Sequence, residues 1–369
     1  MHYLRYLLVF VPLTFLVEYV EAFHSPLLIF LFACLGLVPL AGLLGEATEE
    51  LSVHTGPRVG GLLNATLGNA AELIITIVAL QAGKIELVKA SITGSILGNL
   101  LLILGFSLLL GGIRNGNQRF DRNITSMSAT MMLLAVIGLV IPTMLELIRE
   151  LQVGQLDVFN TAVRDPALDS ISLGVAGVLI VLYVLSLIFT FQQPEAAPHS
   201  KQADETPHVP KWNLPTAIGV LAVVTIVIVF LSEFLVGAVE PVVATLGVSE
   251  LFLGIIIIPL VGNVAEHIVG VQMAFKNKMD LSLTISLGSS MQVALFVAPL
   301  LVFISLLFGP EMTLFFSLME VGALSLAVLT ATFIASDGES NWLEGAQLLA
   351  VYLIIALGFF YIQPNGLVP

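Results

Sequence analysis

Charged residues are scarce in this chain, and their scarcity excludes a soluble globular fold. Asp, Glu, Lys and Arg make up only 11% of the 369 residues, whereas 57% of the residues are hydrophobic. The mean hydropathy is +1.02. A soluble domain needs a charged surface that this composition does not supply. The composition therefore indicates a polytopic membrane protein.

Cysteine and histidine are also rare. The single cysteine, Cys34, lies within an apolar run, so an intrachain disulfide framework and a cysteine-cluster metal site are excluded. The six histidines are scattered and form no HExxH pattern, which makes a membrane metalloenzyme the least favoured class. We therefore expect neither enzymatic activity nor a bound cofactor.

The apolar runs have the length of membrane-spanning helices. Within a bilayer every backbone polar group must be paired internally, which leaves only helices or a closed barrel. The long runs show no alternating strand pattern, so we expect an all-α bundle in the lipid bilayer. We expect eleven spans, at about residues 4–21, 25–48, 59–83, 86–112, 123–145, 171–191, 213–235, 248–275, 280–308, 312–335 and 340–362.

Basic residues are half as common as acidic ones, 13 against 26, which gives a net charge of −13. This charge argues against nucleic acid as a partner and favours a surface that attracts cations. With the spans above, nine Lys and Arg residues lie on the side of the N-terminus and four on the other side. Cytoplasmic loops carry the excess of Lys and Arg, so we expect a cytoplasmic N-terminus.

A stretch rich in Pro, Ala and charge divides the chain into halves. It reads QQPEAAPHSKQADETPHVPK at 192–211 and lacks apolar periodicity, which is typical of a connector. With the orientation above, this connector is cytoplasmic. We therefore divide the chain into a leading helix (1–24), a first five-helix repeat (25–191), a linker (192–212) and a second five-helix repeat (213–369).

The two halves carry the same acidic cassette. GNAAE at 68–72 is matched by GNVAE at 262–266, an offset of 194 residues, and ten of the forty positions from 60 to 99 are identical to their counterparts. The same offset matches Lys84 with Lys278, Gly94-Ser95 with Gly288-Ser289, and Glu46 with Glu240. Because the matches favour Gly, Asn, Glu, Lys and Ser over common apolar residues, they indicate a duplication. Halves of five spans insert with opposite orientation, which predicts an inverted repeat with a site at the midplane.

Glu72 and Glu266 are the central residues of the cassettes. Each lies near the middle of its span, where an ionised carboxylate costs at least ~2.5–3.5 kcal/mol and the side chain is too short to reach water. Two such carboxylates need cations, protons or a watery cavity. Because close buried like charges repel one another, protons can replace a cation on the pair, and the empty doubly ionised state is disfavoured. These are the requirements of a cation/proton antiporter.

The neighbours of these glutamates offer oxygen and no thiolate. Asn69 and Asn263 each precede a glutamate by three residues and share its helix face. The candidate metal ligands are Glu72, Glu266, Asn69, Asn263, Ser95, Ser289, Gln292 and Asn99. Such a set suits hard cations such as Ca²⁺. The two serines could instead be small residues for helix packing, and Asn99 is equally compatible with a packing hydrogen bond. Gly68 and Gly262, with Pro259, can weaken the helices and free backbone carbonyls.

The segments GGLLNATLGNAAELII (60–75) and 259–301, with GNVAEH and GSSMQ, resemble the two signature repeats of the Ca²⁺/H⁺ exchanger family, within the calcium/cation antiporter superfamily. The resemblance implies eleven spans, a leading helix before two inverted five-helix repeats, and exchange of Ca²⁺ for protons. It implies that Glu72 and Glu266 are the essential carboxylates, and that the first helices of the two repeats slide to switch access. The linker 192–211 is poorer in acids than in some relatives, which puts calcium sensing there in doubt.

Two other functions remain open from the sequence. An antiporter for another cation, such as Mn²⁺ or Na⁺, would use the same kind of oxygen site. A cation channel is less favoured, because channels build their pores from several copies or from filter loops. We expect a multi-pass protein of the cell membrane, with a vacuolar or other internal membrane as the alternative. The sequence is compatible with a homo-oligomer.

Overall fold

The computed structural model describes residues 2–153, 166–192, 210–309, 311–363 and 366–367, and it confirms the expected all-α bundle. The α-helices are α1 (Phe10–Tyr19), α2 (Pro26–Thr55), α3 (Pro57–Leu67), α4 (Ala70–Gln81), α5 (Ile85–Leu97), α6 (Leu104–Asn115), α7 (Arg122–Val153), α8 (Pro166–Gln192), α9 (Leu214–Leu246), α10 (Glu250–Phe252), α11 (Ile258–Gly262), α12 (Val264–Phe275), α13 (Met279–Gln292), α14 (Ala298–Phe308), α15 (Leu318–Ala335) and α16 (Trp342–Tyr361).

Short irregular elements complete the chain. Two are 3₁₀ helices, η1 (His2–Val9) and η2 (Glu21–Phe23). Three are π-helical turns, η3 (Gly98–Ile103), η4 (Leu253–Ile257) and η5 (Val293–Val297). Strands β1 (Gln118–Arg119) and β2 (Glu339–Ser340) pair antiparallel, as do β3 (Ile362–Gln363) and β4 (Gly366–Leu367).

The number of spans is compatible with the eleven expected. Among the described residues, eight helices are long and apolar enough to cross a membrane, and two bent pairs bring the number to ten. The leading segment predicted at 4–21 is divided between η1 and α1 and is not one α-helix. Several helices continue past their predicted ends, α2 to Thr55 and α9 to Leu246. Hydropathy marks where a helix leaves the bilayer, and a helix can continue into water.

Both cassettes break their helices at the same place. The axis bends by 45° between α3 and α4, and by 65° between the helix 250–262 and α12. Asn69 and Asn263 stand at these breaks with non-helical backbone angles, which confirms that the cassettes weaken the helix. Each glutamate therefore lies in the first turn of a new helix, where the positive end of the helix dipole favours a negative charge.

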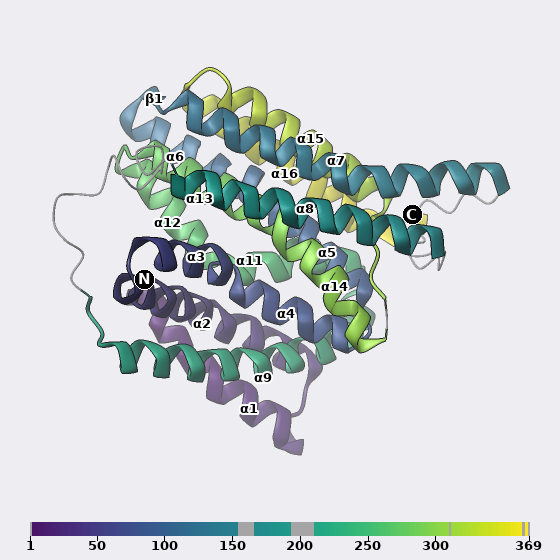
Figure 1. Cartoon of the computed structure of the whole chain (residues 1–369). Coiled ribbons are helices and arrows are strands. Elements are labelled where there is room, and N and C mark those ends of the chain that lie inside the picture. The colour runs from purple at the N-terminus through teal and green to yellow at the C-terminus, as the bar shows by residue number, and fades with distance from the viewer. Residues whose placement is uncertain (1, 154–165, 193–209, 310, 364–365, 368–369) are drawn as a thin grey trace.

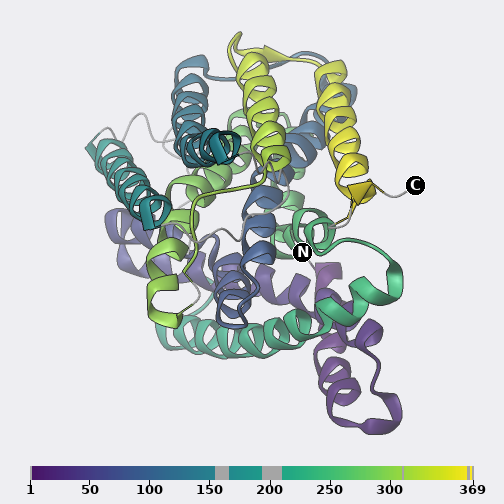
Figure 2. The same cartoon turned by 90° about the vertical axis from the view of Figure 1, so that its right-hand side faces the viewer.

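Helices α2 and α9 pack along one another at one side of the bundle (Figures 1 and 2). They run antiparallel, because His54 at the end of α2 bonds to the Trp212 carbonyl, just before α9, at 2.7 Å. The buried Glu50 carboxylate also accepts the backbone N–H groups of Lys211 (2.8 Å) and Trp212 (3.1 Å). Of the predicted linker 192–212, residues 193–209 lie outside the described part of the chain. Its last residues are thus held by α2.

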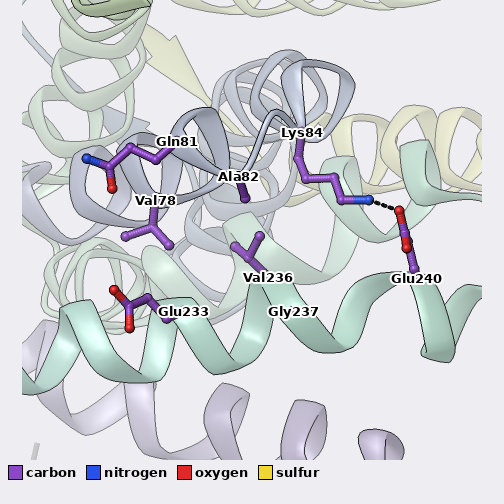
Figure 3. Close-up of a pocket in the computed structure, with 8 residues that line it drawn as sticks. All are labelled: Val78, Gln81, Ala82, Lys84, Glu233, Val236, Gly237 and Glu240. Carbon is purple, nitrogen blue, oxygen red and sulfur yellow. Dashed lines mark hydrogen bonds and ion pairs between the residues drawn. The ribbon is translucent and has the colours of Figure 1, made fainter. Parts of the chain in front are cut away.

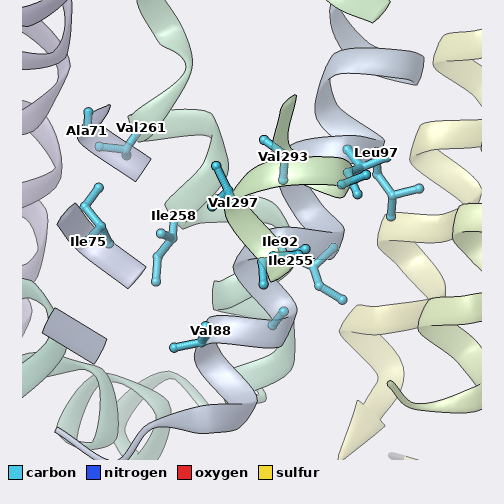
Figure 4. Packing of buried hydrophobic residues seen from close by; sticks show 14 of the residues in the cluster. Ala71, Ile75, Val88, Ile92, Leu97, Ile255, Ile258, Val261, Val293 and Val297 are labelled. Atoms are coloured by element: carbon cyan, nitrogen blue, oxygen red, sulfur yellow. The ribbon is translucent and has the colours of Figure 1, made fainter. Parts of the chain in front are cut away.

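The remaining helices pair across the two halves. Helix α6 packs against α16, α8 against α14, and α7 against α15. Strands β1 and β2 join the turn after α6 to the turn after α15. Apolar side chains of α4, α5, η4, α11 and η5 fill the centre of the bundle (Figure 4). This core holds the two helix breaks in place.

Gly94 on α5 allows the closest helix contact beside the cassettes. A Cβ at this position would overlap the carbonyl oxygen of Ile255 and lie 2.6 Å from Cγ of Pro259. Backbone atoms cannot rotate away as a long side chain can. The two halves therefore meet here through a glycine, as is common between membrane helices.

Replacement of Gly94 by alanine should destabilise the protein. Overpacking of this kind costs about 1–3 kcal/mol of the free energy of unfolding, so we expect the melting temperature of the purified protein in detergent to fall by a few degrees. The matched control is Gly288→Ala, because a Cβ at Gly288 meets nothing within 4 Å. Equal melting temperatures for the two variants would show that the Gly94 contact does not limit the packing.

Candidate cation-binding site

The Glu72 carboxylate is buried where the two halves meet. It is 5% exposed. Ser95 on α5 donates a hydrogen bond to its Oε1, and the amide of Asn263, at the break before α12, donates to the same oxygen at 2.5 Å. Asn263 also donates to the Ser95 hydroxyl at 3.1 Å. One carboxylate thus binds polar groups from both halves.

Gly262 gives the room for this approach. A Cβ there would lie 3.1 Å from Cγ of Glu72, which is tighter than ordinary van der Waals contact. The glycine of one cassette therefore lets the glutamate of the other cassette come close. This contact explains why a glycine, and not a larger residue, is useful at the start of the motif.

Glu266 occupies the matching place in the first turn of α12 and is half-buried. Ser289, the counterpart of Ser95, donates its hydroxyl to the Asn69 oxygen, whereas Ser95 donates to Glu72. The bonds from Asn263 to Glu72 and from Ser289 to Asn69 bring the two cassettes side by side.

A network of amides and hydroxyls extends from Asn69. Its amide donates to Oε1 of Gln292 at 2.6 Å, and its oxygen accepts from Ser289 at 3.0 Å. The fully buried Asn99 donates to the Ser289 hydroxyl at 3.0 Å. Hydrogen bonds thus join four of the eight residues singled out in the sequence, Asn69, Ser289, Asn99 and Gln292, in one group, and three, Glu72, Ser95 and Asn263, in another.

The two halves of this cluster are not equivalent. Gln292 has Gly98 as its counterpart under the 194-residue offset, and Asn99 has Val293. Because Gln292 accepts the amide of Asn69, the hydrogen bonding around Asn69 differs from that around Asn263, which donates to Glu72. The duplication predicted the shared residues, and these two unmatched residues create the asymmetry.

Each glutamate keeps one oxygen without a hydrogen-bond partner. Oε2 of Glu72 and Oε2 of Glu266 are both buried and unpaired in the described part of the chain, as is Oδ1 of Asn99. A buried polar atom without a partner is costly, and more so when it carries charge. A proton or a cation on these oxygens would remove that cost.

The chemistry of the cluster is that of oxygen. In the described ranges, no group of three or more His, Cys, Asp or Glu side chains is placed to hold a metal ion. The available ligands are two carboxylates with neighbouring amide and hydroxyl oxygens. This mixture fits a hard cation such as Ca²⁺, which accepts carboxylate, amide and backbone oxygens in flexible geometry.

The structure contains a second group of buried polar residues that was not predicted from the sequence. On α5, Lys89 is 1% exposed and Thr93 donates to Oε1 of Glu320 at 3.0 Å. Glu320, at the start of α15, is fully buried and forms a capping box with Ser317. The pattern Ser-x-x-Glu at 317–320 was the available signal, since it is typical of a helix N-terminus. The network anchors α15 to the helix that carries Ser95.

Comparisons with known proteins agree on one family. A family model described as sodium/calcium exchanger protein matches residues 25–192 and 216–361. The chain is 42% identical to a Ca²⁺/H⁺ antiporter of Aphanothece halophytica, over 96% of this chain and 95% of that protein. It is also 42% identical to the Ca²⁺/H⁺ antiporter ChaA of Bacillus subtilis, over 90% of this chain and 92% of that protein.

Solved structures show the same similarity. The crystal structure of the Ca²⁺/H⁺ antiporter protein YfkE matches with a TM-score of 0.81 and 38% identity, over 98% of this chain and 100% of that chain. A structure described as the H⁺/Ca²⁺ exchanger CAX shares the fold, with a TM-score of 0.72 at 16% identity, over 97% of this chain and 91% of that chain.

Binding of Ca²⁺ to the cluster should stabilise the protein against heat. A ligand that binds only the folded state at a hundred times its Kd adds about 2.7 kcal/mol to the free energy of unfolding. We therefore expect Ca²⁺ to raise the melting temperature in detergent, and K⁺ at equal ionic strength to leave it unchanged. The double variant Glu72→Gln/Glu266→Gln should lose the Ca²⁺ effect. An equal shift in this variant would place the stabilising cation elsewhere.

Proposed function

The chain belongs to the Ca²⁺/H⁺ exchangers of the sodium/calcium exchanger protein family, and we propose that it moves Ca²⁺ across a membrane in exchange for protons. The observation that carries the proposal is the carboxylate pair at the two helix breaks. Glu72 and Glu266 each have a buried oxygen without a partner among the described residues. The names of the relatives support the same pair of ions.

In this proposal Glu72 and Glu266 alternately hold one Ca²⁺ ion or protons. Both ligands neutralise charge that the apolar surroundings tolerate poorly. The amide and hydroxyl oxygens of Asn69, Asn263, Ser95 and Ser289 complete the cation site, with Gln292 and Asn99 as further polar contacts. Because the cluster without any ligand is disfavoured, a conformational change is favoured only when a cation or protons are bound, which couples the two fluxes.

The halves 25–191 and 213–369 contribute matching helices to the proposed mechanism. Each contributes one broken helix, and each begins with a long helix, α2 or α9, and these two long helices pack against one another. We propose that movement of α2 and α9 relative to the site opens it to one side of the membrane at a time. Protons that run inward down their gradient would drive Ca²⁺ out of the cytosol, across the cell membrane or into an acidic internal compartment.

Transport of another cation is the competing function, because the oxygen ligands also suit Mn²⁺ or Na⁺. Uptake of radioactive Ca²⁺ into proteoliposomes with an acidic interior separates the possibilities. Uptake that needs the pH gradient and stops with a protonophore supports Ca²⁺/H⁺ exchange. Uptake that is indifferent to the gradient would indicate a channel or another counter-ion. Competition by Mn²⁺ or Na⁺ measures selectivity in the same assay.

Neutralisation of either glutamate should stop this uptake. We expect Glu72→Gln and Glu266→Gln each to lower the initial rate by about a hundredfold or more, because ligand charge sets Ca²⁺ affinity over several decades. The control is Glu339→Gln, an exposed carboxylate on β2, which should leave the rate unchanged. A folded Glu72→Gln or Glu266→Gln protein with the rate of the unsubstituted protein would contradict the site assignment.

A further inference from the structure

An ion pair joins the two halves at one end of the bundle, away from the carboxylate cluster. Lys84, in the turn between α4 and α5, donates to the Glu240 carboxylate on α9 (Figure 3). Both residues line a cavity of about 440 Å³ between α4 and α9, together with Gln81 and Glu233. The pair therefore holds the outer helix of one half against the broken helix of the other.

The duplication assigns a counterpart to this pair. Under the offset of 194 residues, Lys84 matches Lys278 and Glu240 matches Glu46. Lys278 lies in the turn between α12 and α13, and Glu46 lies on α2. Glu240 is near the end of α9 that is remote from Trp212, whereas Glu46 is in the half of α2 that ends beside Trp212. The matched residues therefore belong to opposite ends of the bundle.

The counterpart takes a different partner in this conformation. Glu46 binds Arg5 of η1 at 2.8 Å. The helix packing shows the same difference between the two ends. Helix α4 packs against α9 more extensively than its counterpart α12 packs against α2. One end of the bundle is thus held by the Lys84–Glu240 pair, and the equivalent contact at the other end is replaced by the Arg5–Glu46 pair.

We propose that Glu46 and Lys278 form the symmetry-related ion pair in a second conformation of the protein, which opens the site to the other side of the membrane. In that conformation Lys84 and Glu240 separate. The proposal rests on the alternating movement of α2 and α9 described above. In an inverted repeat, the two conformations exchange the roles of the two halves, so a contact made by one half in one state is made by the other half in the other state. These four residues are positioning residues, because they do not belong to the carboxylate cluster.

Arg5 then acts as a competitor for Glu46. While Arg5 holds Glu46, the Lys84–Glu240 conformation is favoured, and when Glu46 moves to Lys278 the second conformation is favoured. The side chains of Lys84 and Glu240 are 20% and 73% exposed, and exposed pairs change a population by about twofold to fivefold at most. The pairs therefore bias the equilibrium without locking it, as turnover requires.

Zero-length crosslinking of the unmodified protein tests the proposal. A water-soluble carbodiimide joins a carboxylate to a lysine amine only where the two are in contact, and it does not join a carboxylate to arginine. The purified protein is treated in Ca²⁺, in chelator at neutral pH, and in chelator at acidic pH, and linked peptides are identified by mass spectrometry. We expect a Lys84–Glu240 link, and a Glu46–Lys278 link whose yield rises in the condition in which the first yield falls.

A Lys84–Glu240 link without a Glu46–Lys278 link in any of the three conditions would overturn the proposal. Crosslinking requires no transport, so this result is independent of the uptake assay. Loss of Ca²⁺ uptake would contradict the proposed function, whereas reciprocal links in that same protein would still support the symmetry-related pair.

The variant Arg5→Ala tests whether the two ends of the bundle are coupled. If Arg5 acted only locally, the yield of the Lys84–Glu240 link would not change. Release of Glu46 at one end should lower the Lys84–Glu240 yield at the other end by about twofold to fivefold. The matched control is Arg119→Ala, because Arg119 forms an exposed pair with Glu339 between β1 and β2, away from α2 and α9. An unchanged Lys84–Glu240 yield in Arg5→Ala would contradict the competition between Arg5 and Lys278.

Discussion

The cost of placing two carboxylates in the apolar middle of a membrane bundle is the constraint on which the rest of this structure depends. Glu72 is 5% exposed and Glu266 is half-buried, and an ionised carboxylate at the centre of a membrane-spanning helix is unfavourable by at least ~2.5–3.5 kcal/mol. The protein meets part of this cost with hydrogen bonds from Ser95 and Asn263 and with the helix ends created at the two breaks. It leaves one oxygen of each carboxylate without a hydrogen-bond partner among the described residues, and a proton or a cation on that oxygen would remove the cost.

The two halves of the chain are similar but not identical. Both halves break their second helix at a Gly-Asn pair, and both carry a π-helical turn in the helix that follows. The serines and glutamates occupy matched positions. Gln292 and Asn99 do not, and they draw Asn69 and Ser289 into hydrogen bonds that the other half lacks.

The ion pairs at the two ends of the bundle also differ between the two halves. The Lys84–Glu240 pair holds α9 and the Arg5–Glu46 pair holds α2, and the two pairs use different elements to do so. Exposed ion pairs contribute little energy. Such small contributions suit the proposed movement of α2 and α9, which passes between conformations of similar free energy. The backbone contacts of Lys211 and Trp212 with Glu50 tie the start of α9 to α2.

The amino-acid sequence alone determined the membrane class, the helical fold and the duplication, and it predicted eight polar residues as one site, seven of which make hydrogen bonds with one another in two groups. Hydropathy and a constant offset of 194 residues are properties of short segments, and no knowledge of packing is needed to read them. Only the tertiary structure decided which donor binds which oxygen, that Gln292 accepts the amide of Asn69, and that Glu46 binds Arg5 while Glu240 binds Lys84. The buried Thr93–Glu320 contact belongs to the same class. Each of these contacts joins helices far apart in the chain, and the rotation and depth of each helix are set by the packing of its neighbours.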